Sequence, residues 1–100
     1  MAKQPIRDQV LSTLIQHRTS LEQLGVSSLE LFGSVARNEA TPESDVDVLV
    51  EFSTEAGLFE LFEVRHYLEH VLGRPVDLGM KESLREHLRE AVLEDIIRAF

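Results

Sequence analysis

Two aspartates one residue apart, Asp45 and Asp47, are the side chains of this chain best suited to chemistry. Side chains alternate across a strand, so we expect both carboxylates on one face with Cα atoms about 7 Å apart. At an effective dielectric constant near 20, like charges about 4 Å apart repel by roughly 4 kcal/mol. No Lys or Arg within residues 45–52 offsets that repulsion. Because Mg²⁺ commonly combines one or two carboxylates with substrate phosphates, the pair predicts a magnesium site.

A glycine and a serine, Gly33 and Ser34, end the apolar run that precedes these aspartates. A glycine lets the backbone approach a phosphate closely, and backbone N–H groups in such a turn can cradle the phosphate. Ser34 has two interpretations at this junction of strand and helix, which are a helix N-cap and a phosphate contact. With the two carboxylates, the turn indicates a site for a nucleotide and its metal.

The spacing of these residues resembles a known signature. Gly33-Ser34, ten intervening residues and Asp45-Val46-Asp47 are similar to the G-S-x10-D-x-D pattern of the DNA polymerase β-like nucleotidyltransferase superfamily. The chain most resembles the minimal nucleotidyltransferases of the MNT type, antitoxins that act beside HEPN-domain toxins. The resemblance runs from about Val26 to Leu88. Where the family usually has glycine after the arginine, this chain has Asn38, and asparagine reaches left-handed conformations readily.

The resemblance implies a reaction and a set of site residues. It implies two Mg²⁺ ions held by Asp45, Asp47 and a third carboxylate, Asp77, which would also draw the proton of the acceptor hydroxyl. Ser34 and the Gly33 backbone would hold the triphosphate of ATP. The implied acceptor is a tyrosine of a cognate HEPN-type toxin, an RNase that the transferred AMP would silence. A helix N-cap or a solvated turn is the structural alternative for Asp77.

Arg37 and Ser44 are further candidates for nucleotide binding. Arg37 lies one turn beyond Ser34 and would point towards the same phosphates, or would instead pair with Glu39 or Glu43. Ser44 matches a serine of the family and directly precedes the first aspartate. We interpret it as a structural hydroxyl or a nucleotide contact rather than a catalyst.

Hydrophobic periodicity predicts the elements that position these residues. Helices are predicted over residues 5–18, 34–38 and 58–73, a turn with a capping box over 20–25, strands over 26–32, 45–52 and 75–79, and one or two closing helices after Lys81. The fold class is therefore α/β, with a small mixed sheet covered by helices. That agrees with the polymerase β-like nucleotidyltransferase core that the resemblance implies. With 100 residues, we expect a single nucleotidyltransferase domain.

Composition restricts the partners. The net charge of −8 disfavours binding to a nucleic acid backbone and favours a basic partner protein or a small substrate delivered with metal. No segment approaches the roughly 18 apolar residues that a membrane span needs, so we expect no membrane association and a cytoplasmic location. The apolar residues of the last segment, including Ile97 and Phe100, could dock a partner or pack in the core. A hetero-oligomer with the toxin and a homo-oligomer both remain open.

A zinc site is the alternative for the histidines. His66, Glu69 and His70 match the H-x-x-E-H pattern of inverted zinc peptidases, and histidines four residues apart share a helix face. Zinc hydrolysis needs a third protein ligand, however, and the apolar stripe of this helix explains it as a core element. His17 and His87 are expected to be solvated.

Two other functions compete with AMP transfer to a toxin. A purely binding antitoxin would block its partner without chemistry, although such a protein has no need for three mutually repelling aspartates. An antibiotic-modifying nucleotidyltransferase of the aminoglycoside type would share the core. Those relatives use additional helical domains to hold the drug, whereas this chain ends soon after the predicted core.

Overall fold

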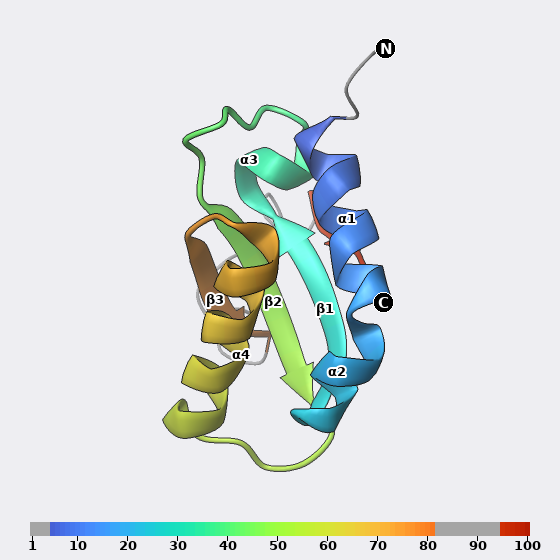
Figure 1. The fold of residues 1–100 in the computed structure, drawn as a ribbon, viewed down its shortest axis with the longest axis vertical. Helices are drawn as coiled ribbons and strands as arrows, with labels where there is room; N and C mark the ends of the chain where they lie inside the picture. The colour runs from blue at the N-terminus through green and yellow to red at the C-terminus, as the bar shows by residue number, and fades with distance from the viewer. Residues whose placement is uncertain (1–4, 82–94) are drawn as a thin grey trace.

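The computed structural model describes residues 5–81 and 95–100, which form a four-stranded sheet with helices packed on one face (Figure 1). Along the chain the elements are α1 (Ile6–Gln16), α2 (Arg18–Gln23), β1 (Val26–Phe32), α3 (Gly33–Ala36), β2 (Val46–Phe52), α4 (Leu58–Leu72), β3 (Val76–Met80) and β4 (Ile97–Arg98). The strand order is β3-β2-β1-β4. β2 pairs antiparallel with β1 and parallel with β3, so the sheet is mixed as predicted.

The apolar face of the central strands forms the core. Val46, Val48 and Val50 alternate along β2 and are fully buried, and Leu29 and Leu31 of β1 lie on the same face. α1 and α4 cover this face (Figure 1). Burying each such side chain stabilises the fold by about 1.5–3 kcal/mol. The residues between the valines therefore point to the opposite face of the sheet.

The turn that follows α3 and leads into the loop before β2 needs a residue in the left-handed conformation. Asn38 has φ 61°, the one non-glycine residue with positive φ in the described part of the chain. The backbone N–H of Asn38 donates to Val35, and that of Glu39 donates to Ser34 at 2.8 Å. This confirms the prediction that asparagine can replace the family's glycine here.

The predicted capping box at Ser20 is wrong. α2 begins at Arg18, directly after α1, and no side chain caps it. The observed capping interaction is at α4, where the Glu60 carboxylate accepts the backbone N–H of Gly57 at 2.8 Å. α4 ends as predicted at Gly73, which takes the left-handed conformation with φ 67°.

The end of the chain also differs from the prediction. Ile97 and Arg98 form β4, a short strand against β1, instead of the end of a helix. Phe100 is buried, and its carbonyl accepts the backbone N–H of Leu29 at 3.2 Å. The physical reason is that the outer edge of β1 carries backbone groups that need partners. The other apolar positions of the predicted closing helices, Leu84, Leu88, Ala91 and Val92, lie outside the described residues.

One of the two histidines predicted to be solvated has a partner. The Nδ1 atom of His17 lies 2.7 Å from the hydroxyl of Tyr67, so the prediction of a solvated side chain is wrong for this histidine. His87 lies outside the described residues. None of the helices in residues 5–81 is long and apolar enough to cross a membrane.

Candidate active site

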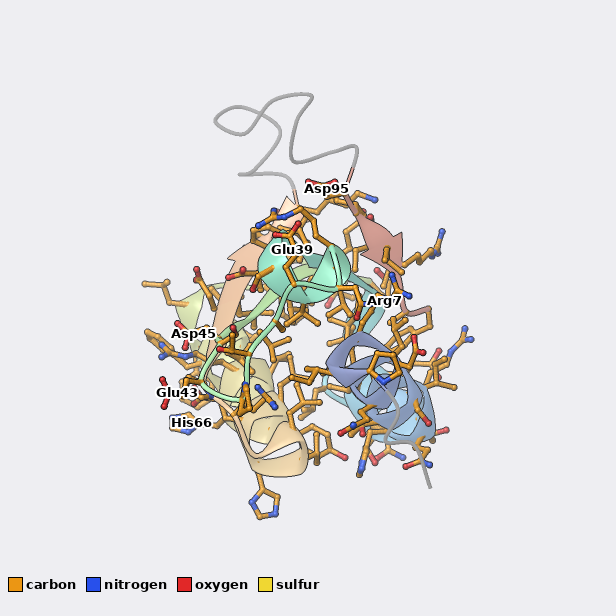
Figure 2. The ribbon with its side chains drawn as sticks, turned by 90° about the horizontal axis from the view of Figure 1, so that it is seen from above. Arg7, Glu39, Glu43, Asp45, His66 and Asp95 are labelled. Atoms are coloured by element: carbon orange, nitrogen blue, oxygen red, sulfur yellow. The ribbon has the colours of Figure 1, made fainter. Side chains whose placement is uncertain are left out.

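Three carboxylates gather at one end of the sheet, on the face opposite the core. Asp47 is the second residue of β2, and the parallel register places Asp77 of β3 directly opposite it. Neighbouring strands lie about 4.8 Å apart, so these two residues are adjacent. Asp45 precedes β2 by one residue, where the loop from α3 enters the sheet (Figure 2). Asp47 is partly buried, whereas Asp45 and Asp77 are exposed.

The charges of these carboxylates are coupled. Partial burial raises the pKa of Asp47 above its ordinary value of 3.8, and the charges of Asp77 and then Asp45 raise it further. The positive charge of Arg37 opposes these effects. A cation placed among the three carboxylates would relieve the repulsion that raises this pKa.

Gly33 is required here for two independent reasons. Its φ of +72° lies in the left-handed region, which side chains other than glycine rarely adopt. A Cβ atom on Gly33 would also fall on the Oδ2 atom of Asp47. The glycine therefore lets the β1–α3 turn lie directly against the central carboxylate of the site.

The hydroxyl of Ser34 is available for a ligand. The N-cap position of α3 belongs to Phe32, so the N-cap interpretation of Ser34 is wrong. Its side chain has no hydrogen-bond partner within residues 5–81 and 95–100. The first N–H groups of a helix also lack intrahelical acceptors. Polar donors thus stand next to Gly33 and the Asp47 carboxylate.

Arg37 makes one of the expected ion pairs, with Glu39, and a second one with Asp95 that was not predicted; its phosphate interpretation stays a prediction. Its guanidinium pairs with Glu39 at 3.3 Å and with Asp95 at 3.7 Å. The same cation lowers the pKa of Asp47. Because the side chain is 42% exposed, a phosphate could still reach it.

Ser44 has a structural role. Its hydroxyl oxygen accepts the backbone N–H of Thr41 at 2.9 Å, and its own N–H donates to the Thr41 carbonyl at 3.0 Å. These bonds close the turn immediately before Asp45. The nucleotide contact therefore has no support from this geometry.

Arg74 is a residue that the sequence argument missed. Its Nη1 atom donates to the carbonyl oxygens of Thr41 and Pro42, both at 3.1 Å, and lies 3.5 Å from that of Ser44. It therefore ties the loop before Asp45 to the segment that leads into β3. The sequence gives no signal for it, because its partners are backbone carbonyls about 30 residues away.

Two cavities flank the sheet at different ends. A small one, about 240 Å³, is lined by Asp45 and Asp77 among others. A larger one, about 710 Å³, lies at the far end of β2 and is lined by residues such as Glu51 and Lys81. None of the predicted site residues lines the larger cavity. The chemistry is thus better placed at the carboxylate end than in the larger space.

The donor set fits a hard divalent cation. Within the described residues, no three His, Cys, Asp or Glu side chains lie close enough together to hold a metal ion in their present positions. Asp45, Asp47 and Asp77 nevertheless offer oxygen atoms alone, which Mg²⁺ prefers, and the charges of Asp77 and Asp45 both act on Asp47.

Glu69 of the H-x-x-E-H pattern has structural contacts. Its carboxylate accepts the backbone N–H of Val76 at 3.1 Å and lies 3.8 Å from the Arg65 guanidinium. These contacts join α4 to the start of β3. They account for Glu69 without a zinc ion.

The nucleotidyltransferase domain family matches residues 14–99, and the chain belongs to that family. More narrowly, it is 40% identical over 91 residues to the protein adenylyltransferase MntA of Thermococcus cleftensis, across 90% of this chain and 92% of that protein. A solved structure described as a minimal nucleotidyltransferase is 36% identical, covers 87% of this chain and 93% of its own, and has a TM-score of 0.68.

A second solved structure supports the fold alone. It is a toxin–antitoxin crystal structure with AMP-PNP, 21% identical, with a TM-score of 0.72 over 90% of this chain and 72% of that one. Together the comparisons confirm the predicted α/β nucleotidyltransferase fold and the relationship to minimal nucleotidyltransferases. They also confirm the predicted enzyme class, a nucleotidyltransferase of the protein adenylyltransferase group.

Proposed function

We propose that this chain transfers AMP from ATP to a tyrosine hydroxyl of a cognate HEPN-type RNase toxin, with Mg²⁺, and thereby acts as its antitoxin. The observation that carries the proposal is the register of Asp47 with Asp77, beside a glycine whose positive φ and close approach to Asp47 both exclude a side chain. The relatedness to a protein adenylyltransferase supports a protein acceptor and AMP as the transferred group. The structural likeness to a toxin–antitoxin protein bound to AMP-PNP is consistent with ATP as donor and a toxin as partner.

The proposed roles follow from the positions of the side chains. Asp45, Asp47 and Asp77 would hold two Mg²⁺ ions, while Ser34 and the Gly33 backbone would contact the triphosphate. Bound Mg²⁺ would neutralise the triphosphate charge and polarise the reacting oxygens. The chain itself supplies orientation, which provides a large part of the rate in such transfers.

The reaction is a single in-line displacement. The tyrosine oxygen forms a bond to the α-phosphorus of ATP, and the bond from that phosphorus to the bridging oxygen of the β-phosphate breaks. Pyrophosphate leaves, and Asp77 takes the proton of the hydroxyl. Asp77 is suited to this role because it is exposed on the edge strand, next to Asp47.

Intact-mass spectrometry tests the proposal. The chain is incubated with ATP, Mg²⁺ and the small helical protein encoded beside it, which should carry an R-x4-H motif. We expect the toxin to gain the mass of one or more AMP units and to lose RNase activity. Asp47→Asn is the matched control and should leave the toxin unmodified.

The test also separates the competing functions. If the toxin mass never changes while RNase activity is suppressed stoichiometrically, the protein is a binding antitoxin without chemistry. The small-molecule alternative has less support, because the relative from Thermococcus cleftensis is a protein adenylyltransferase and this chain spans 92% of it.

A further inference from the structure

The small cavity beside the carboxylates has a mixed lining that the proposed chemistry does not yet explain. It lies between α4 and β3, and it is lined by Asp45, Leu61, Phe62, Arg65, Asp77 and Leu78 among others. We propose that this cavity is the acceptor subsite, and that the exposed apolar residues of α4 beside it dock the acceptor protein. The inference rests on the proposed function and names the acceptor side of the same site.

The size and lining of the cavity suit one aromatic side chain. Sites for whole small ligands commonly enclose about 300–1,000 Å³, and this cavity measures about 240 Å³. A phenol has an apolar ring and a hydroxyl that donates one hydrogen bond. Leu61 and Phe62 offer an apolar wall for the ring, and Asp77 also lines the cavity, so the hydroxyl would reach its carboxylate around the outer edge of β3.

The apolar wall continues onto the surface. Leu58, Phe59 and Phe62 are 70%, 73% and 50% exposed on the first two turns of α4. The Glu60 carboxylate fixes the start of this helix through the Gly57 N–H, so the exposure belongs to an ordered element. Contiguous exposed apolar side chains mark interaction sites, and aromatic residues are enriched in protein interfaces.

Phe62 connects the surface to the cavity. It is half exposed, and it also lines the space that Asp45 and Asp77 share. A partner that covers Leu58 and Phe59 is therefore held where one of its side chains can enter the cavity. This continuity identifies the occupant as the acceptor protein, because an unrelated partner on the same surface would block the reacting groups.

Two other occupants fit the surface less well. α4 carries three glutamates, Glu60, Glu63 and Glu69, against one arginine, so it lacks the basic face of helices that bind anionic membranes. Strand addition to β3 is disfavoured at its start, because Pro75 has no N–H and the Val76 N–H already donates to Glu69. Insertion of a side chain meets neither objection.

The affinity for the toxin tests the inference. The toxin encoded beside this chain is titrated, without ATP, against the whole chain as wild type, Phe62→Ala and Phe59→Ala. Each titration gives the dissociation constant of the complex. We expect each variant to bind at least about tenfold more weakly, as interface aromatics often do. Ile15→Ala is the matched control, because Ile15 is an apolar residue of α1 that is also 55% exposed, and it should change nothing.

Steady-state transfer gives a second readout. Phe62→Ala should raise the KM for the toxin about tenfold or more and leave the KM for ATP unchanged. Toxin affinity and toxin KM equal to wild type in both phenylalanine variants would overturn the inference while leaving AMP transfer intact. The converse result is a wild-type chain that never transfers AMP, while both phenylalanine variants still bind the toxin more weakly than wild type. That result would support the docking surface and overturn the proposed function.

Discussion

Acidic side chains occupy the same face of the sheet at both of its ends, but their surroundings differ. At one end, Glu30 and Glu51 both pair with the Lys81 ammonium, which is 3.2 Å from Glu51, and the Ser28 hydroxyl donates to Glu51. The hydrogen bond to Glu30 is the main cause that raises the pKa of Lys81.

At the other end, no salt bridge within residues 5–81 and 95–100 neutralises the carboxylates. Asp45, Asp47 and Asp77 form no salt bridge within the described residues, and Arg37 is shared with Glu39 and Asp95. Burial and like charges therefore raise the pKa of Asp47. The difference supports the proposal that the acids paired with Lys81 stabilise the fold, whereas the acids without a salt bridge in the described residues would bind a ligand that carries positive charge.

The largest expected effect comes from Asp47→Asn. We expect AMP transfer to fall by about 10³-fold or more, the range seen when a group that stabilises transition-state charge is removed. The melting temperature without metal should stay the same or rise, because a repelled charge is lost. Transfer rates measured by intact mass, together with thermal melting, check both parts. A variant that transfers AMP normally removes Asp47 from the mechanism, and one that melts far below wild type assigns it to the fold.

Gly33→Ala should have the next largest effect. The left-handed φ costs about 1–2 kcal/mol for a residue with a Cβ atom, and the new methyl group also displaces the Asp47 carboxylate. We expect both lower stability in urea unfolding and loss of most AMP transfer.

Gly73→Ala is the matched control for Gly33→Ala. Gly73 has a similar φ of +67°, but a Cβ atom there meets nothing within 4 Å. Its substitution should lower stability by about 1 kcal/mol through the backbone alone and leave transfer near wild type. Equal transfer in the two variants would show that closeness of the turn to Asp47 is unimportant.

The metal dependence of ATP binding tests whether the carboxylate end of the sheet binds the nucleotide. If the repelling carboxylates require a cation before a triphosphate can approach, ATP should bind weakly with Mg²⁺ or Mn²⁺ and at least about tenfold more weakly in EDTA. Isothermal titration measures both conditions. Equal affinity in EDTA would contradict the proposed metal bridge.

The paired end should respond to substitution in stability rather than activity. Lys81→Met leaves the buried Glu30 carboxylate without its cation, and we expect a loss of about 1–3 kcal/mol in the free energy of unfolding. AMP transfer per folded molecule should change less than threefold. A large loss of transfer with unchanged stability would mean that the two ends are not separate in function.

Local pattern was enough to predict most of the elements that carry the candidate site. The period-2 valines predicted β2 and the shared face of Asp45 and Asp47, and β1 was predicted with its observed bounds. The resemblance predicted Asp77 as a site residue. Its position opposite Asp47 follows from the parallel register of β2 and β3, which no local sequence pattern predicts.

Features that depend on distant partners could not be predicted. Arg74 contacts backbone carbonyls of a remote loop, and backbone groups have no sequence signature. The strand at Ile97 resembled a helix because its apolar spacing fits both periods, and only the open edge of β1 decides between them. Long-range pairing, rather than residue type, is what the sequence argument lacked.

The smallest expected effect is the pH dependence of stability without metal, and it reports directly on the unpaired end. Burial and the neighbouring aspartates raise the pKa of Asp47 in the folded state above 3.8. The folded protein therefore binds this proton more tightly than the unfolded chain, so stability decreases as pH rises from about 4 through the folded-state pKa. Asp47→Asn removes the titrating group. The difference in unfolding free energy between variant and wild type should thus grow with pH over this window and then level off. Urea unfolding at a series of pH values in EDTA measures it, and saturating Mg²⁺ should abolish the trend. A difference that is constant from pH 4 to 8 would show that the carboxylates do not repel one another in the folded protein.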